Sequence, residues 1–178
     1  MTLLMDSALR TCHAERRVLQ AWQVLQGVLD PEVPALSVCD LGIVRKVIAH
    51  DDAVEVVLTP TYSGCPATEV IEQAVIDAVD GAGLGPTRVT LQRAPAWTTD
   101  WISDVGKRKL REYGIAPPSG NAAVRQERPI RLIPRERIEC PRCGSPNTER
   151  LSAFGSTACK ALYRCIACRE PFEHFKPI

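Results

Sequence analysis

Four cysteines near the end of the sequence have a spacing that suits metal binding. They form two Cys-x-x-Cys pairs, Cys140 with Cys143 and Cys165 with Cys168, separated by 21 residues. Each pair can present two sulfurs from one tight turn, and two such turns complete a tetrahedron of thiolates. Zn²⁺ prefers this set of ligands, and mononuclear iron accepts it too. We therefore predict a structural metal site that stabilises a small β-rich zinc ribbon and has no open position for catalysis.

A fifth cysteine, Cys65, lies where a helix is predicted to begin. Pro66 favours the first helical position, which would make Cys65 the N-cap residue. The helix dipole and the free N–H groups at that place stabilise a thiolate, so Cys65 is a candidate nucleophile or soft-metal ligand. The alternative is that a small residue only caps the helix. Asp40 either orients Cys65 or shares a metal with it, or it is an ordinary turn carboxylate.

Two further pairs are candidates for contact with a partner. Trp97 and Trp101 place two large rings close together in the sequence, where they either cover a core or form a binding patch. Cys159 and Lys160 lie between the two cysteine pairs. They either belong to a surface loop that contacts a partner, or Cys159 is a small thiol packed inside the ribbon.

Catalysis by the chain itself is not expected. A nucleophilic enzyme needs a base, and none of the three histidines, His13, His50 and His174, lies in a recognisable catalytic context. The paired Glu-x-x-His helices of di-iron proteins are missing from the sequence as well.

The composition is that of a folded chain without a strong net charge. The 178 residues are 45% hydrophobic and 24% charged, with a formal net charge of +1 and eight cysteines. These values exclude disorder of the whole chain and a field that would select nucleic acid. No run approaches the roughly 18 residues of a membrane span, and the first residues lack an export signal. We expect a cytoplasmic protein, in which structural disulfides are uncommon and Cys12 and Cys39 pack as thiols.

The near-neutral total conceals two regions of opposite charge. The first 115 residues carry 11 basic and 15 acidic residues, whereas residues 116–178 carry 11 and 6. Hydrophobic periodicity in the first region predicts a helix, a hairpin, a second helix, a strand and a basic helix: 18–29, 43–59, 70–79, 87–93 and 103–113. Gly114 is expected to end the last helix. The fold class is therefore α/β (α+β): a small mixed-sheet domain at 12–115, an Arg/Pro-containing linker at 116–137 and the zinc ribbon at 138–178.

Ordered motifs in this sequence resemble two known families. Three motifs of the first domain resemble the iron–sulfur assembly family that includes SufT-like proteins: Asp30-Pro-Glu-Val-Pro34, Asp40-Leu-Gly-Ile43 and Thr59-Pro-Thr-Tyr-Ser-Gly-Cys-Pro66. Four later motifs resemble, more narrowly, the D-subunit family encoded with bacterial phenylacetyl-CoA epoxidase: Trp97-Thr-Thr-Asp-Trp-Ile102, Tyr113-Gly-Ile-Ala-Pro-Pro118, Cys140-Pro-Arg-Cys-Gly144 and Pro171-Phe-Glu-His-Phe175. The second resemblance covers nearly the whole chain.

The resemblance implies an accessory role in aerobic phenylacetate breakdown. Ring epoxidation would belong to a di-iron oxygenase subunit, supplied with electrons by a ferredoxin-like iron–sulfur reductase. This chain would assist iron–sulfur cluster or iron delivery to those subunits, with general iron–sulfur assembly proteins as further partners. The resemblance assigns the functional thiol to Cys65, which would hold iron or a cluster transiently, and the carboxylate to Asp40.

Two other functions are carried as alternatives. In the first, the chain is a structural or regulatory subunit that binds the oxygenase complex without handling clusters. In the second, the ribbon binds nucleic acid through the arginines between residues 125 and 137. The second is disfavoured because no aromatic residues are interleaved with these arginines to stack on bases, and neighbouring glutamates dilute their charge.

Overall fold

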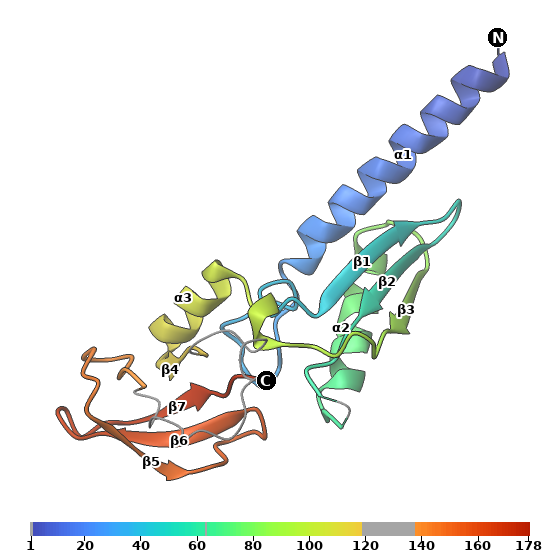
Figure 1. The fold of residues 1–178 in the computed structure, drawn as a ribbon. Coiled ribbons are helices and arrows are strands. Elements are labelled where there is room, and N and C mark those ends of the chain that lie inside the picture. The colour runs from blue at the N-terminus through green and yellow to red at the C-terminus, as the bar shows by residue number, and fades with distance from the viewer. Residues whose placement is uncertain (1, 63, 119–137) are drawn as a thin grey trace. The chain divides into compact units, whose positions relative to one another are not determined.

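The structure is a computed structural model that describes residues 2–62, 64–118 and 138–178, with side chains from His13 onward. It consists of two compact units, Met1–Trp97 and Thr98–Ile178. Figure 1 labels their helices and strands. Among the described residues, no helix is both long enough and apolar enough to cross a bilayer.

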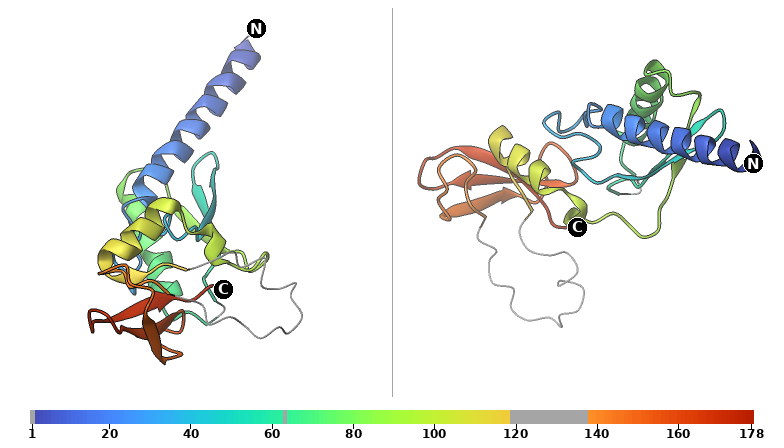
Figure 2. Two further views of the ribbon diagram at one scale, coloured as in Figure 1. Left: turned by 60° about the vertical axis from the view of Figure 1, so that its left-hand side comes forward. Right: turned by 90° about the horizontal axis from the view of Figure 1, so that it is seen from above.

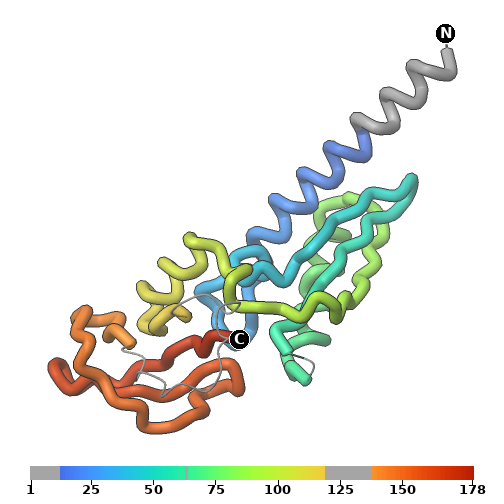
Figure 3. Tube along the Cα trace, viewed as in Figure 1, coloured from blue at the N-terminus to red at the C-terminus, as the bar shows by residue number. Residues whose placement is uncertain are grey.

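The first unit contains a small mixed sheet and two helices. Its elements are α1 (Thr2–Leu25), β1 (Val44–Ala49), β2 (Val54–Leu58), α2 (Thr68–Gly81) and β3 (Thr87–Leu91). The strand order is β1-β2-β3, with β1 and β2 antiparallel and β2 and β3 parallel. The hairpin forms because two runs of β-branched residues flank a polar turn. Helix α2 is the crossover that a parallel pair requires, as the tube in Figure 3 shows.

The apolar positions of the first unit explain why these elements pack together. Val54 and Val56 of β2 and Val75 and Val79 of α2 are completely buried. Helix α1 ends at Leu25, four residues before the predicted end, because the chain turns there with bonds from the N–H of Gly27 and Val28. The segment between α1 and β1 then folds back on itself, and this segment carries two of the acidic residues discussed below.

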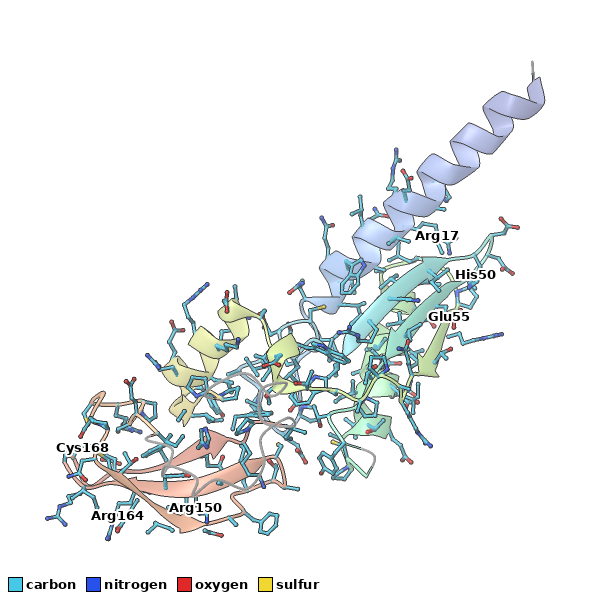
Figure 4. The ribbon with its side chains drawn as sticks, in the orientation of Figure 1. Arg17, His50, Glu55, Arg150, Arg164 and Cys168 are labelled. Atoms are coloured by element: carbon cyan, nitrogen blue, oxygen red, sulfur yellow. The ribbon has the colours of Figure 1, made fainter. Side chains whose placement is uncertain are left out.

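A buried arginine ties α1 to the rest of the first unit. Arg17 is 8% exposed, and its guanidinium donates to the carbonyl oxygens of Leu84 (2.5 Å), His50 (2.6 Å) and Asp51 (3.3 Å). Figure 4 shows Arg17 and His50 side by side at the end of the hairpin. Because these acceptors belong to two different loops, one side chain fixes both loops against the helix.

The second unit contains the ribbon with its two cysteine pairs and, ahead of it in the sequence, a short helical segment that begins at Thr98. Its elements are η1 (Thr99–Trp101), α3 (Asp104–Tyr113), β4 (Ile115–Ala116), β5 (Thr148–Ser152), β6 (Lys160–Cys165) and β7 (Pro171–Phe175). The strand order is β4-β7-β6-β5, with β4 parallel to β7 and the other neighbours antiparallel. Figure 2 shows this sheet from two further directions. Arg164 of β6 pairs with Glu149 of β5 across the sheet.

The boundary between the units differs from the predicted one. Residues 98–116 belong to the unit of the ribbon, because β4 pairs with β7 and α3 contacts β4. As predicted, α3 ends at Gly114, which has φ +92° and donates its N–H to the carbonyls of Leu110 and Arg111. Most of the predicted linker, residues 119–137, lies outside the described residues. The predicted fold class, a mixed-sheet α+β domain followed by a β-rich ribbon, is confirmed.

The paired cysteines take part in the hydrophobic packing of the second unit. One buried cluster consists of Ala116, Ile138, Cys140, Cys165 and Phe172. Two of its residues belong to the cysteine pairs, so the sulfurs lie next to buried apolar side chains. A metal centre that joins the two turns would add to the stability of this packing.

Candidate metal and thiol sites

The four paired cysteines come together as predicted. Their sulfur atoms all lie within 4.8 Å of one another. The Sγ atoms of Cys140 and Cys168 are 3.8 Å apart, and those of Cys143 and Cys165 are 3.6 Å apart. A tetrahedral Zn²⁺ with bonds of about 2.3 Å to sulfur requires separations of about 3.8 Å between its ligands. The donor set and its spacing therefore fit one tetrahedral metal ion.

The backbone of each turn holds its sulfurs in place. The N–H of Gly144 donates to the carbonyl of Cys140 (2.9 Å), and Gly144 adopts φ +71°, which glycine does without strain. In the second turn the N–H of Cys168 donates to Sγ of Cys165 (3.5 Å). This donor lowers the pKa of Cys165 to about 7, since it favours the thiolate. Cys140 and Cys165 are buried, whereas Cys143 is exposed.

Cys65 lies in the turn that precedes α2 and is not its N-cap. Helix α2 begins at Thr68, and its N-cap is Ala67, which has no side-chain cap. The N–H of Cys65 donates to the carbonyl of Tyr62 (3.3 Å), and the carbonyl of Cys65 accepts from Thr68 (3.2 Å). The prediction of an N-cap cysteine is therefore wrong by two residues, because Cys65 closes a turn with Thr68 and the carbonyl of Ala67 accepts the first helical bond, from Ile71 (2.9 Å).

A small cavity lies beside Cys65. Its volume is about 20 Å³. Since a single water needs at least about 10–15 Å³, the cavity has room for one or two atoms. Its wall is formed by residues from the loop after α1, from β1 and β2 and their flanks, from the start of α2 and from β3: Asp30, Ile43, Leu58, Thr59, Pro60, Thr61, Cys65, Thr68, Ile71 and Leu91.

One polar group in the wall of this cavity has no hydrogen-bond partner. Thr59 is 1% exposed, and its Oγ1 makes no hydrogen bond within the described part of the chain. The backbone N–H of Thr59 donates to the carbonyl of Ile43 (2.8 Å), so the residue is fixed at the end of β2. Buried hydroxyls are almost always paired, because an unpaired one costs about 1–3 kcal/mol. This hydroxyl is therefore available to bind a polar ligand in the cavity.

Asp30 brings a carboxylate to the same cavity, although it is not among the predicted site residues. Its Oδ1 accepts from the N–H groups of Glu32 (2.9 Å) and Val33 (2.7 Å), and the residue is 8% exposed. Asp30 directly follows the predicted helix 18–29, and that position alone assigns it no part in a site. Its place in the first family motif, ahead of two prolines, was the signal that could have identified it.

Of the two alternatives for Asp40, the structure shows a turn carboxylate that lies apart from the cavity of Cys65. It is 5% exposed and does not line the cavity of Cys65. Its Oδ2 accepts from the N–H (3.0 Å) and the hydroxyl (2.9 Å) of Ser37, and Ser37 Oγ accepts from the N–H of Asp40 in return (3.0 Å). The carboxylate thus stabilises the turn that leads into β1. Next to it, burial and then the charge of Asp40 raise the pKa of Cys39 to about 11, which disfavours a reactive thiolate.

Three of the four predicted partner contacts are buried. Trp97 is 3% exposed and donates its indole N–H to the carbonyl of Leu41 (2.9 Å), so it covers the core of the first unit. Cys159 is 6% exposed, and the Nζ of Lys160 lies 3.0 Å from a carboxylate oxygen of Glu173. Trp101 is half-buried and belongs to the second unit. Packing therefore accounts for Trp97, Cys159 and Lys160, and none of them offers an exposed surface.

Comparison with known proteins connects both units to named families. The family model described as iron-sulfur cluster assembly protein matches residues 19–91. The model described as PaaD zinc beta ribbon domain matches residues 126–176. The chain is 47% identical over 165 residues, 93% of its length and 96% of the relative, to a protein of Escherichia coli (strain K12) that is provisionally named as the D-subunit of 1,2-phenylacetyl-CoA epoxidase.

Two other similar proteins correspond to the first unit alone. An Fe-S protein maturation auxiliary factor of Porphyromonas gingivalis is 33% identical over 84 residues, which is 46% of this chain and 79% of the relative. A solved structure from Bacillus anthracis, described as a domain of unknown function, DUF59, superimposes with a TM-score of 0.53 at 23% identity. It covers 56% of this chain and 96% of its own, and it supports the fold of the first unit.

Proposed function

Because the chain belongs to the D-subunit family of phenylacetyl-CoA epoxidase, we propose that it is an accessory protein of this oxygenase system that assists the supply of iron or iron–sulfur clusters. Two observations from relatives support the proposal. The family model of its first unit is that of iron–sulfur cluster assembly proteins, and a relative of that unit is named as a maturation factor. The clients would be the oxygenase and the iron–sulfur reductase subunits, in the cytoplasm.

The observation that carries the proposal is the cavity beside Cys65. It combines a half-buried thiol, a buried carboxylate and a buried hydroxyl without a partner, each in the wall of one small cavity. Thiolate and oxygen donors together bind iron, and a half-buried thiol can pass an ion to a client. The cavity has no room for an organic substrate, which is why we propose a carrier and no enzyme.

The second unit has a structural part in this proposal. Cys140, Cys143, Cys165 and Cys168 would hold Zn²⁺, which supplies a rigid tetrahedral crosslink and no reactive position. The chain's own contribution is to hold the four sulfurs at the correct spacing through the two backbone turns.

Complementation in cells tests the function. A strain that lacks this protein would receive the wild type, Cys65→Ser or Cys39→Ala and would be grown on phenylacetate. Cys39→Ala is a suitable control, since Cys39 is also half-buried but does not line the cavity. We expect growth with the wild type and the control and poor growth with Cys65→Ser. Normal growth with Cys65→Ser would contradict a role of this thiol in supply.

The relative named as part of the epoxidase also supports a second candidate, in which the chain binds the oxygenase complex and handles no iron. The two proposals differ in what Cys65 does. If the chain is only a structural component, Cys65→Ser co-purifies with the complex and leaves its iron content unchanged. If it is a supply factor, association can persist while the iron content of the complex falls.

A further inference from the structure

The cavity beside Cys65 limits what the proposed supply factor can hold. A [2Fe–2S] core consists of two irons and two sulfides, whereas the cavity, at about 20 Å³, admits one or two atoms. The number of thiolates leads to the same limit. Iron–sulfur clusters are usually held by four cysteines, and Cys65 is the only cysteine in the wall of this cavity.

The donors in the cavity favour a metal ion over an anion. Asp30 contributes a carboxylate and Thr59 a neutral hydroxyl that has no partner among the residues that the structure describes. An anionic ligand, such as a sulfur atom bound to the thiolate, would lie next to the buried carboxylate and be repelled by it. A divalent cation is attracted by both Asp30 and Cys65. One sulfur combined with oxygen donors is a mixed soft and hard set, which suits Fe²⁺.

The remaining wall supports binding of an ion. Ile43, Leu58 and Ile71 are 3%, 3% and 6% exposed, so they add buried apolar surface to the wall of the cavity. Next to such surface the attraction between an ion and the carboxylate of Asp30 is stronger than in water. Cys65, in the same wall, is only half-buried and therefore accessible to a donor or a client.

From these observations we propose that the cavity holds a single Fe²⁺ ion, bound by the thiolate of Cys65, the carboxylate of Asp30 and the hydroxyl of Thr59. The inference rests on the proposed supply function and specifies its cargo as an ion and not an assembled cluster. Binding forms an iron–sulfur bond and releases the thiol proton of Cys65 to solvent. Iron stays ferrous, so no oxidant or reductant takes part.

Anaerobic titration with Fe²⁺ tests the inference on the full chain whose ribbon has first been loaded with Zn²⁺. Iron and acid-labile sulfide are counted after desalting, and the coordination of ⁵⁷Fe is measured by Mössbauer spectroscopy. We expect one ferrous ion per chain and no sulfide. Cys65→Ser should abolish binding, and Cys39→Ala should leave it unchanged.

Thr59→Val provides the decisive variant, because the wild-type hydroxyl forms no hydrogen bond that the fold requires. Its affinity for Fe²⁺ should fall by about 10-fold or more, in the range found when groups that support a metal are removed. Equal affinity in Thr59→Val and wild type would overturn the inference. So would two or more irons with matching sulfide at Cys65, or a gain in mass of one sulfur atom on Cys65 without iron.

The outcomes separate this inference from the proposed function. If the wild type carries a sulfide-containing cluster on Cys65 and Cys65→Ser still fails to support growth, the single-ion inference is wrong and the proposed function stands. If the wild type binds one ion but Cys65→Ser supports normal growth, the ion site exists and the proposed function is wrong.

Discussion

Because the hydroxyl of Thr59 has no partner within the described part of the chain, we expect it to lower the stability of the first unit. Thr59 is 1% exposed, and its Oγ1 loses the hydrogen bonds that it makes to water in the unfolded chain. That loss costs about 1–3 kcal/mol when nothing replaces it. Valine has nearly the same shape without the hydroxyl. We therefore expect Thr59→Val to raise the free energy of unfolding of the first unit by about 1 kcal/mol.

Thr99 is a matched control for this substitution. It is also 1% exposed, but its Oγ1 donates to the carbonyl of Ile178 (3.4 Å) and accepts from the N–H of the same residue (3.3 Å). Thr99→Val removes both bonds and should lower the free energy of unfolding of the second unit by about 0.5–1.5 kcal/mol. The two substitutions have the same chemistry and similar burial, and they should have effects of opposite sign.

Urea unfolding followed by two-dimensional NMR measures the two units separately. For the first unit, of 97 residues, a gain of about 1 kcal/mol corresponds to a rise in Tm of about 4–8 °C. If Thr59→Val destabilises its unit as much as Thr99→Val does, the hydroxyl is already satisfied in the protein. The reasoning that assigns it to a ligand would then be refuted.

Three further predictions concern contacts within each unit. Arg17→Ala should lower the free energy of unfolding of the first unit by about 2–4 kcal/mol, because three carbonyls lose a charged donor. Arg16 lies on the exposed face of α1, so Arg16→Ala should change this free energy by less than about 0.5 kcal/mol in the same urea assay. The hydroxyl of Thr90 and then His50 lower the pKa of Glu55, so its contribution to stability is present above the ordinary glutamate pKa and is lost as pH falls below about 4.3. Thr90→Val should move the Glu55 pKa upward in an NMR titration, and no change would contradict this assignment. Removal of the ribbon metal with a chelator should unfold the second unit and leave the amide spectrum of the first unit unchanged. If the second unit stayed folded, the metal would not be needed for its stability.

Elements with a strong local pattern could be predicted from the sequence. The hairpin follows from two β-branched runs around His50-Asp-Asp52, and α2 from apolar residues at helical spacing. Gly114 marked the end of α3 correctly, because its φ of +92° is accessible to glycine at low cost. The metal site was predictable for a similar reason, since the spacing within each cysteine pair fixes the local turn.

Features that depend on contacts distant in sequence could not be predicted in this way. Pairing of the two-residue strand β4 with β7, 58 residues later, assigns residues 98–115 to the second unit and not to the first, and no periodicity reveals so short a strand. The cavity of Cys65 is another case. Asp30 reaches it from the loop after α1, and Thr59 lost its hydrogen-bond partners through tertiary burial, which a linear pattern does not contain.

Cluster occupancy of the iron–sulfur reductase in cells tests the central claim most directly. The reductase would be purified without oxygen from strains that carry the wild type, Cys65→Ser or Cys39→Ala, and its iron and sulfide would be counted. We predict full occupancy with the wild type and Cys39→Ala and markedly lower occupancy with Cys65→Ser. Full occupancy in the Cys65→Ser strain would contradict the claim that this thiol supplies iron to the oxygenase system.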